Sequence, residues 1–406
     1  MGEEKANIAM SELFSGAIFP EGLVPGSLFP ILGQRPVGIA RLAAEGEEAG
    51  EGHLVEYRTM ATRSVLNRVE SKRVPWMTWG INPYRGCEFG CRYCYARYTH
   101  EFLEKRDPEL FEREIYIKQH AAWLLRQELK QVRPDEYIAL GTATDPYQPI
   151  ERKAQVTRSL LEVFAEQRGL RLGIVTKSTL IERDIDLLTR IAARNRLTLH
   201  LTITTPDAKL ARILEPRAPR PDLRFRTVER LRAAGLKVGI LCSPLMPGIT
   251  DTPRALEAMA RRAKKAGASF FSSQPLFLKP CSKAVFMRFV REHFPELEKA
   301  YEARYGDRAF VSKAYQERVR ALVRAVVRKH GLQQRFGEDG PTLVGEAAGA
   351  DGMGQPVWPM QAELWGEPGH RGHGAGYRDA GSNGARKPPT PAEAGALQPG
   401  CEGELW

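Results

Sequence analysis

Short apolar runs alternate with longer stretches of helical periodicity through the middle of this 406-residue chain. Six runs rich in apolar and β-branched residues predict strands at 77–82, 137–141, 172–176, 197–204, 238–242 and 269–273. Amphipathic helices are predicted between them at 109–131, 155–167, 182–195, 223–234 and 253–266. Strands and helices that alternate in this way form parallel sheets with right-handed crossovers. The expected fold class is therefore α/β, built as a partial (βα)6 barrel or as an open sheet.

The two ends of the chain lack this pattern. Residues 45–52 are a linker of Glu and Gly, and 337–406 are rich in Gly and Pro without periodic apolar positions. Such composition predicts disorder, because too little apolar surface can be buried. We expect a partly disordered N-terminal extension (1–72), a core with C-terminal helices (73–335) and a disordered tail (336–406).

The balance of charges bears on which partners to expect. The chain has a net charge of +11, and its predicted helix at 313–330 carries many Arg and Lys residues. A basic protein favours polyanionic partners such as DNA or RNA, although an Arg-rich proteome would produce the same excess. No run reaches the roughly 18 apolar residues that a membrane span needs. No apolar signal segment follows the N-terminus, so we expect a cytoplasmic protein without a membrane partner.

Three of the six cysteines, Cys87, Cys91 and Cys94, lie within eight residues. In a reducing compartment such crowding indicates metal or cluster ligation. Three thiolates on one loop can hold three irons of a [4Fe–4S] cluster and leave the fourth iron open. Zinc is an alternative that needs a fourth ligand, such as His100 or a distant residue. A ferredoxin site would need a fourth cysteine nearby, which the sequence lacks.

Polar and turn-forming residues follow several of the predicted strands. Examples are the segments 142–146, 176–178 and 204–206. In parallel α/β folds the chemistry lies at the carboxyl ends of the strands. The sequence therefore predicts an active site at that edge, next to the cysteine loop.

The spacing Cys87-x3-Cys91-x2-Cys94 after a first strand, with Tyr93 before the last cysteine and five further strands, resembles the radical S-adenosylmethionine (radical SAM) superfamily. Residues 79–278 resemble more narrowly its spore photoproduct lyase-like branch, also called DNA repair photolyase-like. The segments that carry this resemblance are 84–87, 142–145, 175–178, 201–204 and 214–216. It implies a partial (βα)6 barrel of the radical SAM type.

The resemblance implies two cofactors, a [4Fe–4S] cluster and SAM. One electron from the cluster would cleave SAM, and the resulting 5′-deoxyadenosyl radical would abstract hydrogen from a substrate. It also implies a reducing partner, a flavodoxin or ferredoxin. The substrate stays open between nucleic acid and a small molecule or protein side chain. A third hypothesis is a non-enzymatic iron–sulfur or zinc module that binds nucleic acid.

The resemblance further implies that seven residues bind SAM: Tyr93, Thr142, Thr144, Asp145, Lys177, Ser178 and Thr202. The turn at 142–145 would accept hydrogen bonds from the SAM amino group, and Lys177 would pair with its carboxylate, assisted by Thr202. Tyr93 would lie near the adenine and Ser178 near the ribose. The alternative for each is structural: a capped turn, a solvated charge at the start of a helix, an ordinary strand threonine or a packing tyrosine.

At one position the sequence departs from the lyase-like pattern. The lyase has a cysteine at the end of its second strand that returns hydrogen to the product radical, whereas this chain has Gly141 or Thr142 there. Cys242, at the end of the fifth strand, is the candidate catalytic thiol. The alternative is that Cys242 is a small buried apolar residue. Whether SAM is consumed or regenerated stays open.

Overall fold

The computed structural model describes residues 36–52, 54–69 and 77–333, all within one compact unit that spans Met1–Trp365. The predicted tail at 336–406, with Cys401, lies outside the described residues, as does much of the predicted N-terminal extension. The division of the chain into three regions therefore stays a prediction.

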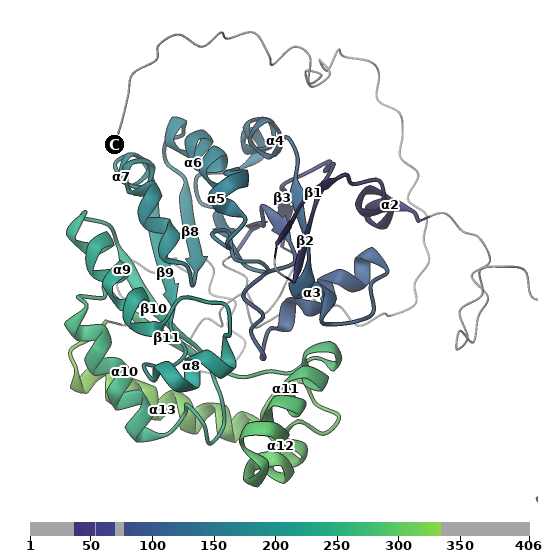
Figure 1. Ribbon diagram of the computed structural model, residues 1–406. Helices are drawn as coiled ribbons and strands as arrows, with labels where there is room; N and C mark the ends of the chain where they lie inside the picture. The colour runs from purple at the N-terminus through teal and green to yellow at the C-terminus, as the bar shows by residue number, and fades with distance from the viewer. Residues whose placement is uncertain (1–35, 53, 70–76, 334–406) are drawn as a thin grey trace, which may run out of the picture. The chain divides into compact units, whose positions relative to one another are not determined.

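A seven-stranded sheet with the order β11-β10-β9-β8-β7-β4-β3 forms the centre of the compact unit (Figure 1). Its strands are β3 (Leu66–Arg68), β4 (Trp79–Ile81), β7 (Tyr137–Leu140), β8 (Arg171–Thr176), β9 (Arg196–Thr202), β10 (Val238–Leu245) and β11 (Phe271–Pro275). Every neighbouring pair from β4 to β11 is parallel, and β3 is antiparallel to β4. The α/β prediction with six parallel strands is confirmed. Because β3 and β11 are edges, the sheet does not close into a full barrel.

Helices follow the strands of this sheet and cover its outer face (Figure 1). They are α5 (Glu151–Ala154), α6 (Val156–Glu166), η4 (Thr179–Asp184), α7 (Ile185–Ala192), α8 (Ala208–Leu214), α9 (Pro221–Ala233) and α10 (Pro253–Lys265). The inner strands of the sheet are largely buried on both faces, and every residue of β10 is buried. This is the pattern of parallel strands that are covered on both sides.

One predicted element is wrong: residues 109–131 do not form a single helix. The structure has α3 (Leu110–Arg113), then the strand β6 (Glu114–Lys118), then α4 (Ala121–Glu128) and η3 (Leu129–Gln131). The strand has the sequence EIYIK, and its β-branched and aromatic residues favour extended backbone over helix.

The strand β6 belongs to a second sheet that the sequence did not predict. Its order is β1-β2-β6-β5, with β1 (Glu48–Gly52), β2 (Val55–Met60) and β5 (Tyr84–Arg85). β2 and β6 are parallel, and β5 is antiparallel to β6. The short helix α2 (Gly38–Ala44) packs against β2. Because β5 and β6 flank the cysteine loop and η2 (Tyr95–Leu103), this sheet holds both ends of that segment.

The described chain ends with α11 (Pro280–His293), η5 (Pro295–Leu297), α12 (Glu298–Tyr305) and α13 (Lys313–Lys329). The predicted basic helix at 313–330 is present as α13, which packs on α10 through Val319, Val326 and Val327. Its charged residues lie on the other side of the helix, in keeping with the amphipathic pattern.

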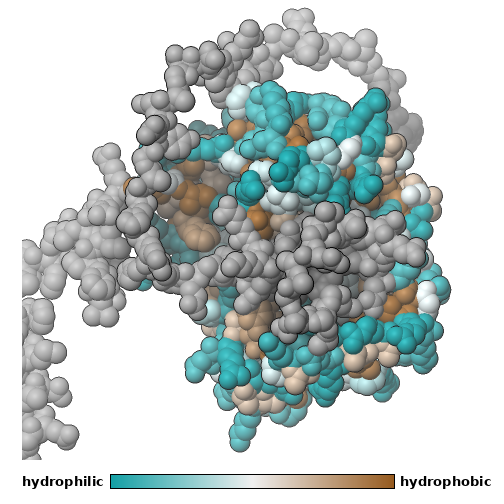
Figure 2. All heavy atoms as spheres, turned by 180° about the vertical axis from the view of Figure 1, so that it is seen from behind, coloured by the Kyte–Doolittle hydropathy of each residue, from teal (hydrophilic) through white to brown (hydrophobic). Residues whose placement is uncertain are grey.

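The described surface exposes few large apolar side chains, namely Val37, Leu54, Phe102, Trp123 and Leu223. Figure 2 shows one face, on which apolar residues form small patches among hydrophilic ones. Within the described ranges, no helix is both long and apolar enough to cross a membrane.

Candidate functional site

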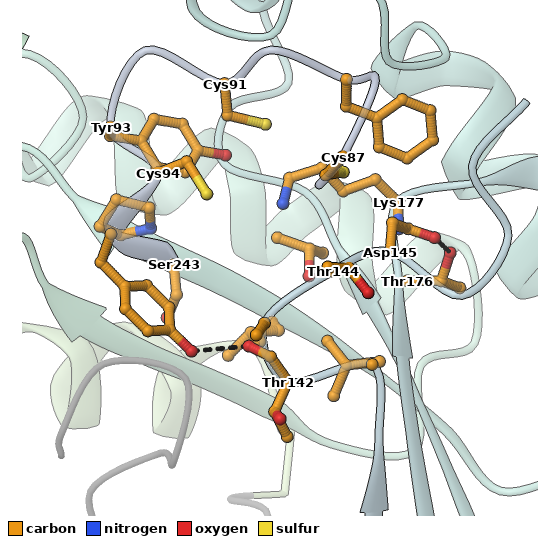
Figure 3. A pocket seen from close by; sticks show the side chains of 18 of the residues that line it. Cys87, Cys91, Tyr93, Cys94, Thr142, Thr144, Asp145, Thr176, Lys177 and Ser243 are labelled. Carbon is orange, nitrogen blue, oxygen red and sulfur yellow. Dashed lines mark hydrogen bonds between the residues drawn. The ribbon is translucent and has the colours of Figure 1, made fainter. Parts of the chain in front are cut away.

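A cavity at the carboxyl edge of the main sheet brings together the ends of four strands and the cysteine loop (Figure 3). Its polar and thiol lining is Cys87, Cys91, Tyr93, Cys94, Tyr95, Thr142, Thr144, Asp145, Thr176, Lys177, Thr202 and Ser243. The cysteines lie along one side of the cavity, facing the strand ends. The prediction that chemistry-bearing residues gather where the parallel strands end is confirmed.

The cysteine loop is fixed by backbone hydrogen bonds at both ends. Cys87 N–H donates to Phe111 O over 2.9 Å, and Arg92 N–H donates to Leu214 O over 2.9 Å. Gly86 has a φ of +79°, and a Cβ there would lie 2.5 Å from the carbonyl oxygen of Glu114. Only glycine fits this turn, because other residues rarely adopt such a φ and backbone blocks the space. The loop geometry is therefore encoded locally.

A buried ion pair supports the same loop from below. The Arg97 guanidinium lies 2.5 Å from Glu112 and donates to the carbonyl oxygens of Cys91 at 3.1 Å and Pro108 at 2.7 Å. Both side chains are almost wholly buried. Buried charges of this kind persist only when they are paired and hydrogen-bonded, so Arg97 holds the Cys91 carbonyl rigidly.

The three cysteine thiols are the candidate ligands of a cluster. Burial raises the pKa of all three thiols, so that metal binding must displace their protons. Within the described ranges, no three His, Cys, Asp or Glu side chains converge closely enough to hold a single metal ion. Thiols that face one cavity without converging on a point match a cluster, in which each thiolate binds a different iron.

The turn after β7 is organised by Asn82 and Asp145. Asn82 Oδ1 accepts hydrogen bonds from the N–H groups of Ala143 at 2.8 Å and Thr144 at 3.2 Å. The Asp145 carboxylate accepts from the Thr176 hydroxyl at 2.6 Å, from Lys177 N–H at 2.7 Å and from Tyr147 N–H at 2.9 Å. Both oxygens of Asp145 are thus occupied, and its carboxylate ties the end of β7 to the end of β8.

The Lys177 side chain points into the cavity among acidic groups. Burial alone would lower the pKa of Lys177, but the nearby acidic groups Cys91, Glu215 and Asp145 raise it above its ordinary value. Its ammonium lies 5.7 Å from the centre of the Tyr93 ring. Lys177 is therefore a cation at neutral pH, held over an aromatic face.

Beneath Tyr93 lies a buried network centred on Glu215. This carboxylate accepts hydrogen bonds from the hydroxyls of Tyr93 and Thr204 and pairs with Arg224 at 2.5 Å. Burial raises the pKa of Glu215, but the charges of Arg224 and Lys177 outweigh it and lower the pKa below its usual value. The network fixes the orientation of the Tyr93 ring beside the cysteines.

Two buried hydroxyls in the cavity wall stand without partners. Thr202 and Ser243, from β9 and β10, are 1% and 5% exposed. Among the described residues, neither Thr202 Oγ1 nor Ser243 Oγ has a hydrogen-bond partner. An unsatisfied buried hydroxyl is costly, and both face a cavity that a polar ligand would fill.

Two other predicted positions lie elsewhere. Ser178 caps η4, where its hydroxyl accepts from Leu180 N–H, and it does not line the cavity. Cys242 is 1% exposed, and its thiol contacts the carbonyl oxygen of Thr204 at 3.7 Å within the apolar core. Because side chains alternate along a strand, Leu241 and Ser243 face the cavity and Cys242 faces away. The structure thus gives Cys242 no contact with the site.

Sequence reasoning missed Asn82 and Glu215, whose side chains position the site. Asn82 is the last residue of a predicted strand, and Glu215 lies in the segment 214–216 that carried the resemblance. Their roles depend on contacts with residues that are distant in sequence.

The comparisons with known proteins bear directly on this geometry. Residues 81–263 match the Radical SAM superfamily, and the match includes the three cysteines and the ends of β7, β8, β9 and β10. An uncharacterised protein of Mycobacterium tuberculosis is 31% identical over 281 residues, which cover 68% of this chain and 82% of that protein. The chain belongs to the radical SAM superfamily.

Reductive cleavage of SAM at a [4Fe–4S] cluster is the general reaction of this superfamily. This radical SAM enzyme is also 26% identical to an uncharacterised protein of Methanocaldococcus jannaschii over 232 residues, which cover 56% of this chain and 81% of that protein. The fold of this chain is similar to that of a spore photoproduct lyase mutant solved with bound AdoMet and dinucleoside spore photoproduct. The TM-score is 0.51 at 16% identity, over 68% of this chain and 79% of that chain.

Proposed function

We propose that Cys87, Cys91 and Cys94 hold a [4Fe–4S] cluster at which this enzyme cleaves SAM. The observation that carries the proposal is one cavity that joins three cysteine thiols, a cation and two hydroxyls without partners among the described residues. When bound, the cluster supplies the electron that breaks a carbon–sulfur bond of SAM and so yields methionine and a 5′-deoxyadenosyl radical. The protein contributes position, charge and the exclusion of water.

Lys177 is the residue that we assign to the SAM carboxylate. Its ammonium is the cation that faces the cavity, and an ammonium suits an oxyanion partner. The hydroxyls of Thr202 and Ser243 are free to donate to the same ligand. These three groups come from the ends of three adjacent strands, so the sheet sets their spacing.

Thr142 and Thr144 are proposed to receive the SAM amino group, and Tyr93 to lie beside the adenine. Both threonines line the cavity, in the turn that Asn82 holds. We assign Asp145 a positioning role, because its two oxygens already hold the backbone that carries Lys177. Ser178 would act only as the cap of η4.

Nucleic acid is the substrate class that we propose for the radical. The spore photoproduct lyase solved with a dinucleoside photoproduct shares this fold, and this chain carries a net charge of +11. Hydrogen return by Cys242 is not part of the proposal, since its thiol faces the core. A flavodoxin or ferredoxin is the proposed electron donor.

The test is anaerobic reconstitution with iron and sulfide, reduction with dithionite, and EPR with and without SAM. We expect a cluster signal that changes when SAM is added, and 5′-deoxyadenosine as a product. Cys87→Ala, Cys91→Ala and Cys94→Ala should each abolish both readouts. Cys281→Ala is the matched control and should retain them, since Cys281 does not line the cavity.

The outcomes separate this proposal from its alternatives. Zinc in place of iron, with no cleavage of SAM, would leave a binding module. Cleavage of SAM that a metabolite fraction stimulates, and that DNA or RNA leaves unchanged, would keep the radical chemistry and reject the nucleic-acid substrate.

A further inference from the structure

A second cavity, of about 280 Å³, adjoins the cluster cavity. The residues that line both are Tyr95, Thr142, Ala143 and Thr144. The second cavity is also lined by Asn67, Arg68, Val69, Met77, Gly80, Asn82, Tyr84, Arg85, Tyr98, Thr99, Phe102 and Lys118. The turn after β7 is therefore a wall that the two cavities share.

The charged groups of this second cavity are all positive. Arg68, Arg85 and Lys118 line it, and its described lining contains no Asp or Glu. Arg85 on β5 pairs with Tyr116 on β6, two residues before Lys118. Since alternate residues of a strand share a face, the Arg85 and Lys118 side chains lie on the same face of the small sheet.

Among the described residues, neither of these two cations forms an ion pair, although the charge of Glu128 acts on Lys118. Lys118 is 6% exposed, and the described residues give its ammonium no hydrogen bond and no ion pair. Arg85 Nε is buried and has no hydrogen-bond partner among them. Burial, followed by repulsion from Arg85, lowers the pKa of Lys118 to about 7, against a smaller opposing effect of Glu128.

Elsewhere in the described chain, comparable buried guanidinium groups are paired. Arg97 with Glu112, Arg224 with Glu215, and Arg183 with Glu151 lie 2.5, 2.5 and 2.8 Å apart. A buried charge without a partner is strongly destabilising, and two adjacent like charges are more so. The unpaired cations of the second cavity therefore differ from these pairs. An anionic ligand bound there would offset the energetic cost of burying them.

Aromatic side chains line the same cavity beside the cations. The Tyr98 ring lies 6.4 Å from Tyr95 and 5.8 Å from Phe102, and Phe102 is 57% exposed although it is large and apolar. Cations combined with aromatic faces are how proteins bind single nucleotides, through the phosphate and the stacked base.

We propose that the second cavity is the substrate subsite, in which Arg85 and Lys118 bind a phosphate group of the nucleic-acid substrate. This inference rests on the proposed function and adds to it the place where the substrate is held. The shared wall would fix a phosphate beside the cluster cavity while the adjoining nucleoside faces that cavity. The exposed ring of Phe102, which packs on the buried Tyr98, is the aromatic face that a base could contact.

The experiment uses reconstituted holoenzyme and matched ligands. Isothermal titration calorimetry would compare inorganic phosphate, acetate, the dinucleotide thymidylyl-thymidine and its uncharged methylphosphonate analogue. We expect the wild type to bind phosphate and the dinucleotide, and to bind the uncharged analogue at least about tenfold more weakly, as loss of a charged hydrogen-bond partner implies. Lys118→Met and Arg85→Gln should each weaken the binding of the dinucleotide by a similar factor of at least about tenfold.

Lys118→Arg keeps the charge and should retain most of the binding, which separates loss of a ligand contact from misfolding. Lys265→Met, on the exposed side of α10, is the matched control and should bind like the wild type. For an oligonucleotide, Lys118→Met should also reduce the slope of log K against log salt by about 1. The circular dichroism spectrum and iron content of each variant check its fold.

Three results would overturn the inference: no binding of phosphate by the wild type, equal binding by Lys118→Met and Arg85→Gln, or acetate bound as tightly as phosphate. If the wild type cleaves SAM but binds no phosphate, only this inference fails. If phosphate binding depends on Lys118 but SAM is not cleaved, the proposed function fails and the anion site stands.

Discussion

The two adjoining cavities share a wall but balance charge in opposite ways. In the cluster cavity, Lys177 is surrounded by Asp145 and Glu215, and Glu215 is itself paired with Arg224. In the second cavity, the positive charges of Arg85 and Lys118 repel each other, and the described lining contains no carboxylate. Among the described residues, the first site is balanced by carboxylates of the chain itself, whereas the second has an excess of positive charge, for which we propose an external anion.

The largest effect on stability is expected from a substitution of Glu215, the carboxylate that balances charge beside the cluster cavity. Glu215→Gln leaves the Arg224 guanidinium buried without a counter-charge, so we expect the protein to lose about 3–5 kcal/mol of stability. Urea unfolding of the cluster-free protein measures this. Glu166→Gln removes an exposed partner of Arg126 and should cost about 1 kcal/mol or less. If the two substitutions lowered stability equally, the buried Glu215–Arg224 pair would be no more important for stability than an exposed ion pair.

A substitution of Lys118 is expected to raise the stability of the protein, whereas that of Glu215 lowers it. Lys118→Met removes a buried, unpaired charge and keeps an unbranched apolar chain, so the free protein should gain about 1–4 kcal/mol. Urea unfolding in a phosphate-free buffer measures the gain, and Lys265→Met should stay within about 0.5 kcal/mol of the wild type. A destabilised Lys118→Met variant would contradict the view that this cation lacks a partner.

The pH dependence sharpens the same contrast. The pKa of Lys118 is about 7 in the folded protein and 10.5 in its ordinary state, so the unfolded chain binds more protons between these values. Stability should therefore rise with pH from about 7 to about 10.5 and be independent of this group below pH 7. Arg68, Arg85 and Tyr98 face Lys118, and Glu128 acts on it from α4. Comparison of unfolding across that range should show the rise in the wild type and its loss in Lys118→Met.

The smallest effect is expected at the unpaired hydroxyls. Thr202→Val should raise the dissociation constant of SAM about tenfold, because one hydrogen bond to a charged ligand is lost. Without SAM the same variant should be as stable as the wild type or slightly more stable, since the hydroxyl has no partner among the described residues. Thr198→Val, on the same strand but outside the cavity, is the control. Unchanged SAM binding in Thr202→Val would remove that threonine from the site.

The parallel sheet was predictable because several of its strands are apolar along most of their length. Segments such as 238–242 are buried on both faces, so their sequences alone mark them as strands. The small sheet was not predictable in this way. Glu114–Lys118 is short, carries its charged residues at its two ends, and lies between two segments that form helix, so helical periodicity was read across it.

The candidate site divides in the same manner. The three cysteines, the 142–145 turn and Lys177 are close in sequence to strand ends, and the structure brings them to one cavity as expected. Cys242 shows the limit of that reasoning, because the alternation of side chains along β10 turned its thiol into the core. The hydrogen bond between Glu215 and Tyr93 joins residues 122 positions apart, so the local sequence could not predict it.

The small sheet has a consequence for how the protein is assembled. β5 and β6 hold the two ends of the cysteine segment by backbone hydrogen bonds, and Arg97 ties its middle to Glu112. None of these links uses iron. In a zinc finger, by contrast, the metal supplies the energy that closes the loop. Here the polypeptide's own hydrogen bonds and ion pair close the loop, so cluster binding has to supply less of the closure energy than the metal of a zinc finger does.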